Sequence, residues 1–480
     1  MTSSPRTLTE AAAALRAGET TSLALTEAAL AAADAHDERT GTYLARFDDY
    51  ALATARAADT DFGNGVDRGP LQGIPIGVKD IIAMAEGPTT AQSLVLDRSW
   101  GAGRDAPVVA RLKAAGAVIT GKTSTMEFAV GMPDDSKPFP IPRNPWDTET
   151  WPGGSSSGTG SGVAAGLFFA GLGTDTGGSI RIPAAFCGVT GLMPTFGRVP
   201  KSGCVPLGYS LDHIGPLARS ASDCATVLAT IAGHHPSDPD SVSAPFRAPE
   251  DLGRADLAGL RIGVVRDEHH FPDNGDPALV DTFSAAVAVL AELGATVVEV
   301  RLPYWSQMRT ANMLTLACEA LAYHRGDATD RWTDFFAGTR AILAQGALVS
   351  GADYVQAQRM RRVAQDAIDR MFDEVDVIAC PTASITAPPI RDHVGERGST
   401  NMLSLFASVH TGYWDCLGNP VLAMPMGFGA NGLPLSVQLA GRAFTEATIL
   451  RTADAFQQVT DWHLATPPLV ATATATTTAA

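Results

Sequence analysis

The sequence predicts an α/β fold built from layers of helices and strands, and two observations carry this prediction. Between residues 259 and 460, short runs of β-branched residues alternate with longer runs in which apolar residues recur at helical spacing. Apolar residues make up 45% of the 480-residue chain and charged residues 18%, so the chain can bury a large core and carries too little charge to stay disordered.

The N-terminal region is expected to be a helical hairpin with a packing role, because it is rich in Ala, Leu and Glu at helical spacing. Thr7 with Glu10 three residues later fits a capping box before the run from Ala11. Thr21 marks a second helix start, and Asp105 is expected to cap a helix further along.

The middle of the chain contains a Gly- and Ser-rich block over residues 153–178. A linker is the simple interpretation of that composition, but the apolar stretch 163–170 inside it indicates a buried segment. The expected strands are residues 73–82 (a strand or turn), 118–120, 260–265, 296–300, 375–379, 421–424 and 435–439, and the later helices are 277–293, 305–325, 334–346, 352–373 and 445–459.

Composition argues against several classes of function. The formal net charge is 35 − 51 = −16, and an acidic surface repels phosphate backbones, so we expect no nucleic-acid partner. No apolar stretch approaches the roughly 18 residues of a membrane span, so we expect a cytoplasmic protein with no membrane partner. The six cysteines form no CxxC pair, which argues against zinc and against a disulfide scaffold.

Lys79 is a candidate catalytic base. It is one of five lysines and lies in the apolar string from Ile74 to Ile82. Burial there would lower its pKa by disfavouring the ammonium form. The alternative is that Lys79 only pairs with the neighbouring Asp80.

The Gly/Ser block predicts an oxyanion site. The N–H groups of Thr176, Gly177, Gly178 and Ser179 could face one oxygen. No GxxxxGK[ST] motif accompanies them, so a nucleotide phosphate is disfavoured. Ser156 fits a G-x-S-x-G elbow, but that pattern arises easily by chance here. A serine nucleophile with a lysine base is the combination that remains.

These residues resemble the amidase signature family of serine hydrolases, which cleave amides through a Ser–cis-Ser–Lys triad. The resemblance covers about residues 8 to 460. It is carried by segments 71–80, 152–156, 175–183 and 187–192, with support from 376–382, 418–421 and 432–439. It implies a large mixed twisted β-sheet flanked by helices on both faces.

The resemblance assigns roles to individual residues. It makes Lys79 the base, Ser155 the bridging serine after a cis peptide bond, and Ser179 the nucleophile that forms the acyl-enzyme. It also makes Asp175 and Arg181 a pair that braces the nucleophile loop, and Ala129 a backbone position lining the substrate. The sequence departs from the family pattern at Ser157-Gly158 and at Met193, where a lysine is common.

One amidase domain is expected over residues 1–470. Its parts are a helical region 1–65, a signature core 66–232, a polar excursion 233–258 and a C-terminal α/β part 259–470, followed by a low-complexity tail 471–480.

The expected function is hydrolysis of a small amide, aryl amide or carbamate, with no cofactor, no metal and a small-molecule substrate as the partner. A homodimer through the N-terminal helices is implied by resemblance alone. One alternative is the glutamine-hydrolysing A subunit of a tRNA-dependent amidotransferase, although residues 318–325 lack the Ser-Asn-Leu-Ala-Arg-Tyr-Asp run expected there. A hydrolase that prefers esters or carbamates is also compatible with these residues, as is a catalytically silent protein on the same scaffold.

Overall fold

The strands of the protein form one mixed sheet in a computed structural model that describes residues 5–471. Their order across this 11-stranded sheet is β1-β3-β2-β4-β6-β5-β10-β11-β9-β7-β8. The strands are β1 (Tyr43–Arg46), β2 (Pro75–Lys79), β3 (Val118–Thr123), β4 (Ala170–Asp175), β5 (Thr190–Met193), β6 (His213–Ala218), β7 (Arg261–Val265), β8 (Thr296–Val300), β9 (Val377–Pro381), β10 (Val421–Phe428) and β11 (Pro434–Gly441).

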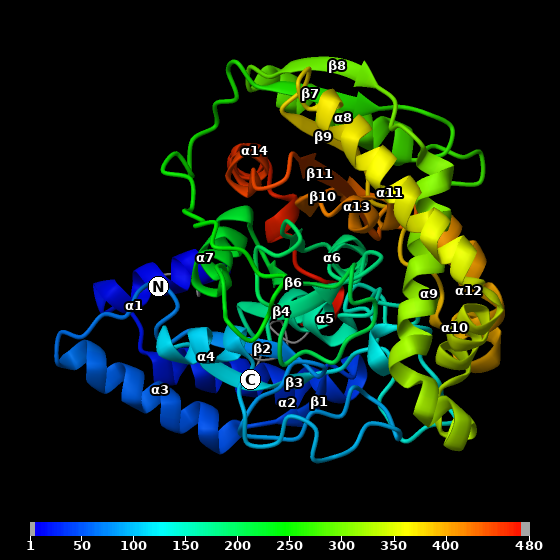
Figure 1. The fold of residues 1–480 in the computed structure, drawn as a ribbon. Helices are drawn as coiled ribbons and strands as arrows, with labels where there is room; N and C mark the ends of the chain where they lie inside the picture. Colours follow the sequence, from blue (N-terminus) through cyan, green and yellow to red (C-terminus); the bar gives the residue numbers. More distant parts are fainter. Residues whose placement is uncertain (1–4, 472–480) are drawn as a thin grey trace.

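Helices flank the sheet, with the N-terminal ones beside β1–β3 and α9–α12 along another side of the molecule (Figure 1). They are α1 (Leu8–Ala17), α2 (Ser22–Thr40), α3 (Asp48–Gly63), α4 (Pro107–Ala114), α5 (Ser157–Ala165), α6 (Arg181–Cys187), α7 (Ala221–Ile231), α8 (Leu279–Glu292), α9 (Trp305–Asp330), α10 (Ala337–Leu348), α11 (Gly351–Met371), α12 (Gly395–Ala407), α13 (Gly412–Leu417) and α14 (Glu446–Gln458). The predicted α/β fold with a large mixed sheet is confirmed.

Two groups of parallel strands are joined by antiparallel pairing in the middle of the sheet, and the edge strand β1 pairs antiparallel with β3. β2 lies parallel to both β3 and β4, and β7 lies parallel to both β8 and β9. The link between these halves is β10, which pairs antiparallel with β5 and β11. Met193, at the end of β5, is fully buried in an apolar cluster. Strands from the predicted signature core and from the predicted C-terminal α/β part belong to this one sheet. The four-part division of the chain stays a prediction.

Several local predictions are confirmed and others are wrong. Thr7 and Thr21 cap α1 and α2, and Thr7 forms the predicted capping box with Glu10. Asp105 does not cap α4, because its carboxylate accepts the Ala85 N–H instead. The N-terminal region is also more than a hairpin, since β1 adds an edge strand to the sheet. Residues 472–480 of the predicted tail lie outside the described residues.

The Gly/Ser block folds into α5 and β4 because its small residues allow close packing. A Cβ atom on Gly158, in α5, would lie 2.2 Å from the Thr42 carbonyl oxygen and 2.6 Å from Ser124 Oγ. Glycine is therefore required there by contact with neighbouring backbone. No helix within residues 5–471 is both long and apolar enough to cross a membrane.

We expect Gly158→Ala to destabilise the protein by about 2 kcal/mol or more, because the new methyl group overlaps backbone that cannot move away. Gly326→Ala in α9 is the matched control, since nothing lies within 4 Å of its added Cβ. Alanine should stabilise that helix by about 0.5–1 kcal/mol. Urea unfolding followed by circular dichroism measures both changes, and equal free energies of unfolding for the two variants would contradict this account.

Candidate active site

Three segments of the chain meet at one edge of the sheet. β2 ends in Lys79, β4 ends just before the loop that carries Ser179, and Ser155 lies in the loop before α5. Because β2 and β4 are parallel neighbours, their carboxyl ends lie at the same edge, where α/β sheets commonly bind ligands. The two serine loops are joined by the Ser156 N–H, which donates to the Ser179 carbonyl at 3.1 Å.

The Lys79 side chain is fully buried and its amine is surrounded by hydroxyl groups. Its Nζ lies 2.7 Å from Ser155 Oγ, 3.0 Å from Ser156 Oγ and 2.7 Å from Thr174 Oγ1. No carboxylate of residues 5–471 forms an ion pair with it. Burial lowers the pKa of Lys79 to about 7, although more distant acidic groups act in the opposite direction. A large fraction of the amine is therefore uncharged at neutral pH.

The alternative that Lys79 only pairs with Asp80 is wrong. Asp80 lies 3.0 Å from the amine of Lys122 on β3, and it accepts hydrogen bonds from the N–H and the hydroxyl of Thr90. Successive side chains at the end of a strand point to opposite faces, which separates the Asp80 carboxylate from the Lys79 amine.

The hydroxyl groups around Lys79 have different hydrogen-bonding roles. Ser156 Oγ lies 3.2 Å from the Thr174 carbonyl oxygen and accepts the Thr174 N–H at 3.2 Å. Its single proton goes to that carbonyl, so Ser156 can only accept from the lysine. An uncharged amine donates two hydrogen bonds and accepts one, so Ser155 or Thr174 donates to it. Of these two residues, Ser155 lies in the loop whose Ser156 N–H is hydrogen-bonded to the Ser179 carbonyl.

The peptide bond between Gly154 and Ser155 is cis. The Ser155 carbonyl accepts the Met126 N–H at 3.3 Å, which ties this loop to the turn that carries Ala129. Ala129 has a φ of +63°, and it lines a cavity together with Thr176. The structure thus brings Lys79, Ser155 and the turn of Ala129 to one place.

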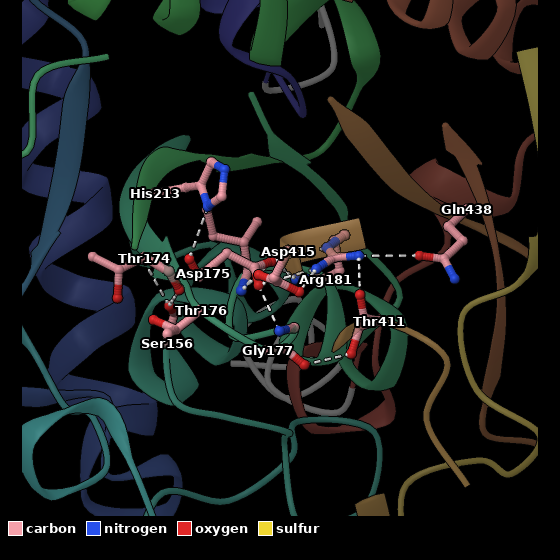
Figure 2. A network of polar contacts seen from close by, with 12 residues as sticks. Ser156, Thr174, Asp175, Thr176, Gly177, Arg181, His213, Thr411, Asp415 and Gln438 are labelled. Carbon is pink, nitrogen blue, oxygen red and sulfur yellow. Dashed lines mark hydrogen bonds and ion pairs between the residues drawn. The ribbon is translucent and has the colours of Figure 1, made fainter. Parts of the chain in front are cut away.

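Residues 176–180, between β4 and α6, carry Ser179 and are called the nucleophile loop below. Asp175 and Arg181 form a buried ion pair at the base of this loop (Figure 2). The Arg181 guanidinium lies 2.9 Å from Asp175 through Nε and 2.5 Å from Asp415 through Nη2. Burial disfavours the Asp175 carboxylate, but the Arg181 charge outweighs this effect and lowers the pKa of Asp175 to about 2. Burial raises the pKa of Asp415, and the neighbouring Asp175 charge adds to that effect.

The predicted set of four oxyanion donors is incomplete. The Gly178 N–H donates to Asp175 at 2.5 Å and cannot face a substrate oxygen at the same time. By contrast, the N–H groups of Gly177 and Ser179 donate to no acceptor within the part of the chain that the structure describes. Gly177 and Ser179 are partly exposed, whereas the fourth predicted residue, Thr176, is buried, so the N–H groups of Gly177 and Ser179 remain the candidates.

Sequence reasoning missed four residues that contact the predicted site, and it connected a fifth, Ser156, only with a weak elbow motif. Ser156 and Thr174 lie beside Lys79, and Asn312, Thr411 and Asp415 lie beside the nucleophile loop. Asn312 Nδ2 donates to the Thr176 carbonyl at 3.1 Å, and Thr411 Oγ1 donates to the Gly177 carbonyl at 2.6 Å. Ser156 and Thr174 lie within the Gly- and Ser-rich block 153–178, whereas Asn312, Thr411 and Asp415 lie in no motif recognised in the sequence.

Two cavities border this loop. A cavity of about 270 Å³ is lined by Thr174, Thr176, Ala129 and Lys201, among others, and a second of about 410 Å³ is lined by residues that include Gly177. Within residues 5–471, no three His, Cys, Asp or Glu side chains lie together as they would to hold a metal ion.

Solved structures of similar fold include a peptide amidase and an amidotransferase subunit. The peptide amidase from Stenotrophomonas maltophilia matches with a TM-score of 0.82 and 32% identity, covering 95% of this chain and 97% of that chain. The A subunit of glutamyl-tRNA(Gln) amidotransferase from Thermotoga maritima matches with a TM-score of 0.76 and 28% identity, covering 91% of each chain.

A curated relative corrects the expected partners. The A subunit of glutamyl-tRNA(Gln) amidotransferase from Chloroflexus aggregans is 40% identical over 488 aligned positions, which cover 96% of this chain and 98% of the relative. We expected a small-molecule substrate, no nucleic acid and at most a second copy of the chain. That expectation is wrong, because a relative aligned from end to end is by name one component of an enzyme for a transfer RNA substrate. A net negative charge therefore says too little about local binding surfaces.

The family itself is shown by a direct match. The family model described as Amidase covers residues 24–450, which is most of the chain, and it includes every candidate residue of the site. Together with the full-length relatives, this match confirms the resemblance found in the sequence: the chain belongs to the amidase signature family of enzymes.

Proposed function

We propose that the protein hydrolyses the side-chain amide of glutamine as the A subunit of a glutamyl-tRNA(Gln) amidotransferase, through an acyl-enzyme on Ser179. The chemistry rests on one observation, the buried Lys79 amine, which is held by hydroxyl groups and has no carboxylate partner among the described residues. The choice of glutamine and of a multi-subunit enzyme rests on the end-to-end similarity to the A subunits of such enzymes.

The proposed reaction moves one proton through Ser155. Lys79 accepts the Ser155 proton while Ser155 takes the proton of Ser179, whose oxygen attacks the amide carbon. The N–H groups of Gly177 and Ser179 stabilise the resulting oxyanion. The relay then returns the proton to the amide nitrogen, which leaves as ammonia. Water attacks the acyl ester by the same route, and it releases glutamate and the free serine.

A second candidate is cleavage of a peptide amide or another small amide without other subunits. Two observations favour it: the TM-score with the peptide amidase is higher than with the amidotransferase chain from T. maritima, and residues 318–325 in α9 lack the run expected of such chains. Esters and carbamates should be tested as substrates in the same assay, because a lysine relay can also assist the departure of their leaving groups.

We expect Ser179→Ala to lower glutamine-dependent ammonia release by at least about 10³-fold, because the nucleophile is lost. Ser99→Ala, at an exposed loop serine, is the control and should keep full activity. Ammonia is measured with and without the other amidotransferase subunits and glutamyl-tRNA. Release from glutamine that needs these components supports the first candidate, whereas cleavage of a peptide amide by the chain alone supports the second. Unchanged turnover in Ser179→Ala would refute both.

The rate should rise with pH through an apparent pKa of about 7, because Lys79 acts as a base only after it loses its proton. Glu127 also has a pKa raised to about 7, chiefly by burial, so Glu127→Gln separates the two groups. We expect the ascending limb of kcat/KM to persist in that variant. A limb near the ordinary lysine pKa, or its disappearance in Glu127→Gln, would count against Lys79.

We further propose that Asp175, Arg181 and Asp415 hold the nucleophile loop in place. Arg181→Met leaves the buried Asp175 carboxylate without its counter-charge, so we expect a loss of about 3–5 kcal/mol in the free energy of unfolding. Arg16→Met breaks an ion pair with Asp67 at the surface and should cost at most about 1 kcal/mol. Chemical denaturation compares the two, and similar losses would contradict the proposal.

A further inference from the structure

The turn that carries Ala129 borders both cavities at the nucleophile loop. Ala129 lines the smaller cavity, and the next residue, Val130, lines the larger one together with Gly177. α10, which packs against α9 and α12 (Figure 1), contributes to the same wall, because Ile342 also lines the larger cavity. The position of this turn relative to α10 therefore affects the shape of the space beside the nucleophile loop.

The backbone of this turn has an uncommon conformation. Phe128 and Ala129 have φ values of +50° and +63°, in the left-handed region that residues with a Cβ atom rarely adopt. The Phe128 ring is buried, and its centre lies 4.1 Å from that of the His324 ring. Two successive residues in this region persist only where the surrounding structure holds them. The turn therefore depends on contacts with other segments.

Glu127 makes such a contact from within the turn. Its side chain is fully buried, and a buried carboxylate is unfavourable unless hydrogen bonds compensate for the lost water. The carboxylate accepts the Ser93 hydroxyl at 2.7 Å and the Phe336 N–H at 2.6 Å. Phe336 is the residue just before α10, so its N–H lies at the positive end of the helix dipole, which stabilises a carboxylate.

Asp134 makes a second contact with the same helix. Its carboxylate accepts the N–H of Ala337, the first residue of α10, at 2.9 Å. Between the two acids the chain touches the helix directly, since a Cβ atom on Gly338 would lie 2.6 Å from the Met132 backbone nitrogen. We call these two carboxylates and the two N–H groups that they accept the acid clamp. The acid clamp joins residues 127–134 to the start of α10.

We propose that Glu127 is a positioning residue, which holds the turn of Ala129 against α10 in the geometry that admits the substrate, and that Asp134 supports it from the other end of the segment. This inference rests on the proposed function, in which an amide occupies the space beside the nucleophile loop. The proposed nucleophile, relay and base belong to other segments. Loss of the acid clamp therefore weakens substrate binding and leaves the chemical step nearly intact.

The test removes the Glu127 carboxylate and restores its shape. Glu127→Ala leaves the Phe336 N–H without its acceptor, so we expect KM to rise about tenfold or more while kcat stays within about threefold. Glu127→Gln should keep a KM near that of the unchanged protein, because an amide oxygen can still accept this N–H. Ammonia release is measured against the concentration of glutamine with the assembled amidotransferase, or of a peptide amide where the chain acts alone.

Asp223→Ala is the matched control, because Asp223 is also a buried acid at the start of a helix. It accepts the Thr9 hydroxyl at 2.8 Å and forms the capping box of α7, and it lines neither of the two cavities. Its loss should lower the free energy of unfolding but leave KM unchanged. An unchanged KM in Glu127→Ala, or an equal rise in Asp223→Ala, would overturn the inference.

Two further measurements decide the matter where Glu127→Ala fails to fold. Asp134→Ala should also raise KM, and an unchanged KM there would overturn the inference. Hydrogen exchange in the Ser179→Ala protein requires no change in the acid clamp: saturating glutamine or peptide amide should slow exchange of the Phe336 and Ala337 N–H groups, and unchanged rates would contradict the proposal. Turnover with an unchanged KM in the clamp variants refutes this inference alone, whereas no turnover of any amide by the unchanged protein refutes the proposed function and this inference with it.

Discussion

The removal of Lys79 from water is the constraint on which the rest of the site depends. An ammonium group at that position loses its hydration and contacts three hydroxyl groups, and no carboxylate of residues 5–471 pairs with it. A pKa that falls from 10.5 to about 7 corresponds to roughly 5 kcal/mol against the charged form. The neighbouring acid, Asp80, is kept away by its pairing with Lys122. A carboxylate beside Lys79 would stabilise its ammonium form and raise its pKa again.

The nucleophile loop is held by residues from both halves of the sheet. Asp175 and Arg181 come from the elements on either side of the loop, while Asp415 and Thr411 come from the C-terminal part. Arg181 also contacts the side chain of Gln438 on β11 at 3.3 Å. These contacts explain why a continuous sheet matters to the site: the loop geometry depends on strands that are more than 200 residues apart in sequence.

The surroundings of the loop differ in how their charges are balanced. At its base, every buried charge has a partner of opposite sign, and the result is rigidity. In the larger cavity, Arg309 is partly exposed, and its guanidinium donates to the Phe406 carbonyl at 2.7 Å. The charges that hold the loop are thus buried and paired, whereas Arg309 stays within reach of solvent.

Local sequence determined the parts of this protein whose causes are local. The cap of Thr7, the helices after residue 259 and the apolar setting of Lys79 were predictable because neighbouring residues produce them. Glycine spacing and family resemblance predicted Ser155 and Ser179 as candidate residues, while α5 and β4 within the Gly-rich block could not be assigned by periodicity. Only the tertiary structure decided that Asp80 pairs with Lys122, that Gly178 donates to Asp175, and that Asn312, Thr411 and Asp415 reach the loop. These contacts depend on how distant strands pair, and no run of neighbouring residues records that pairing.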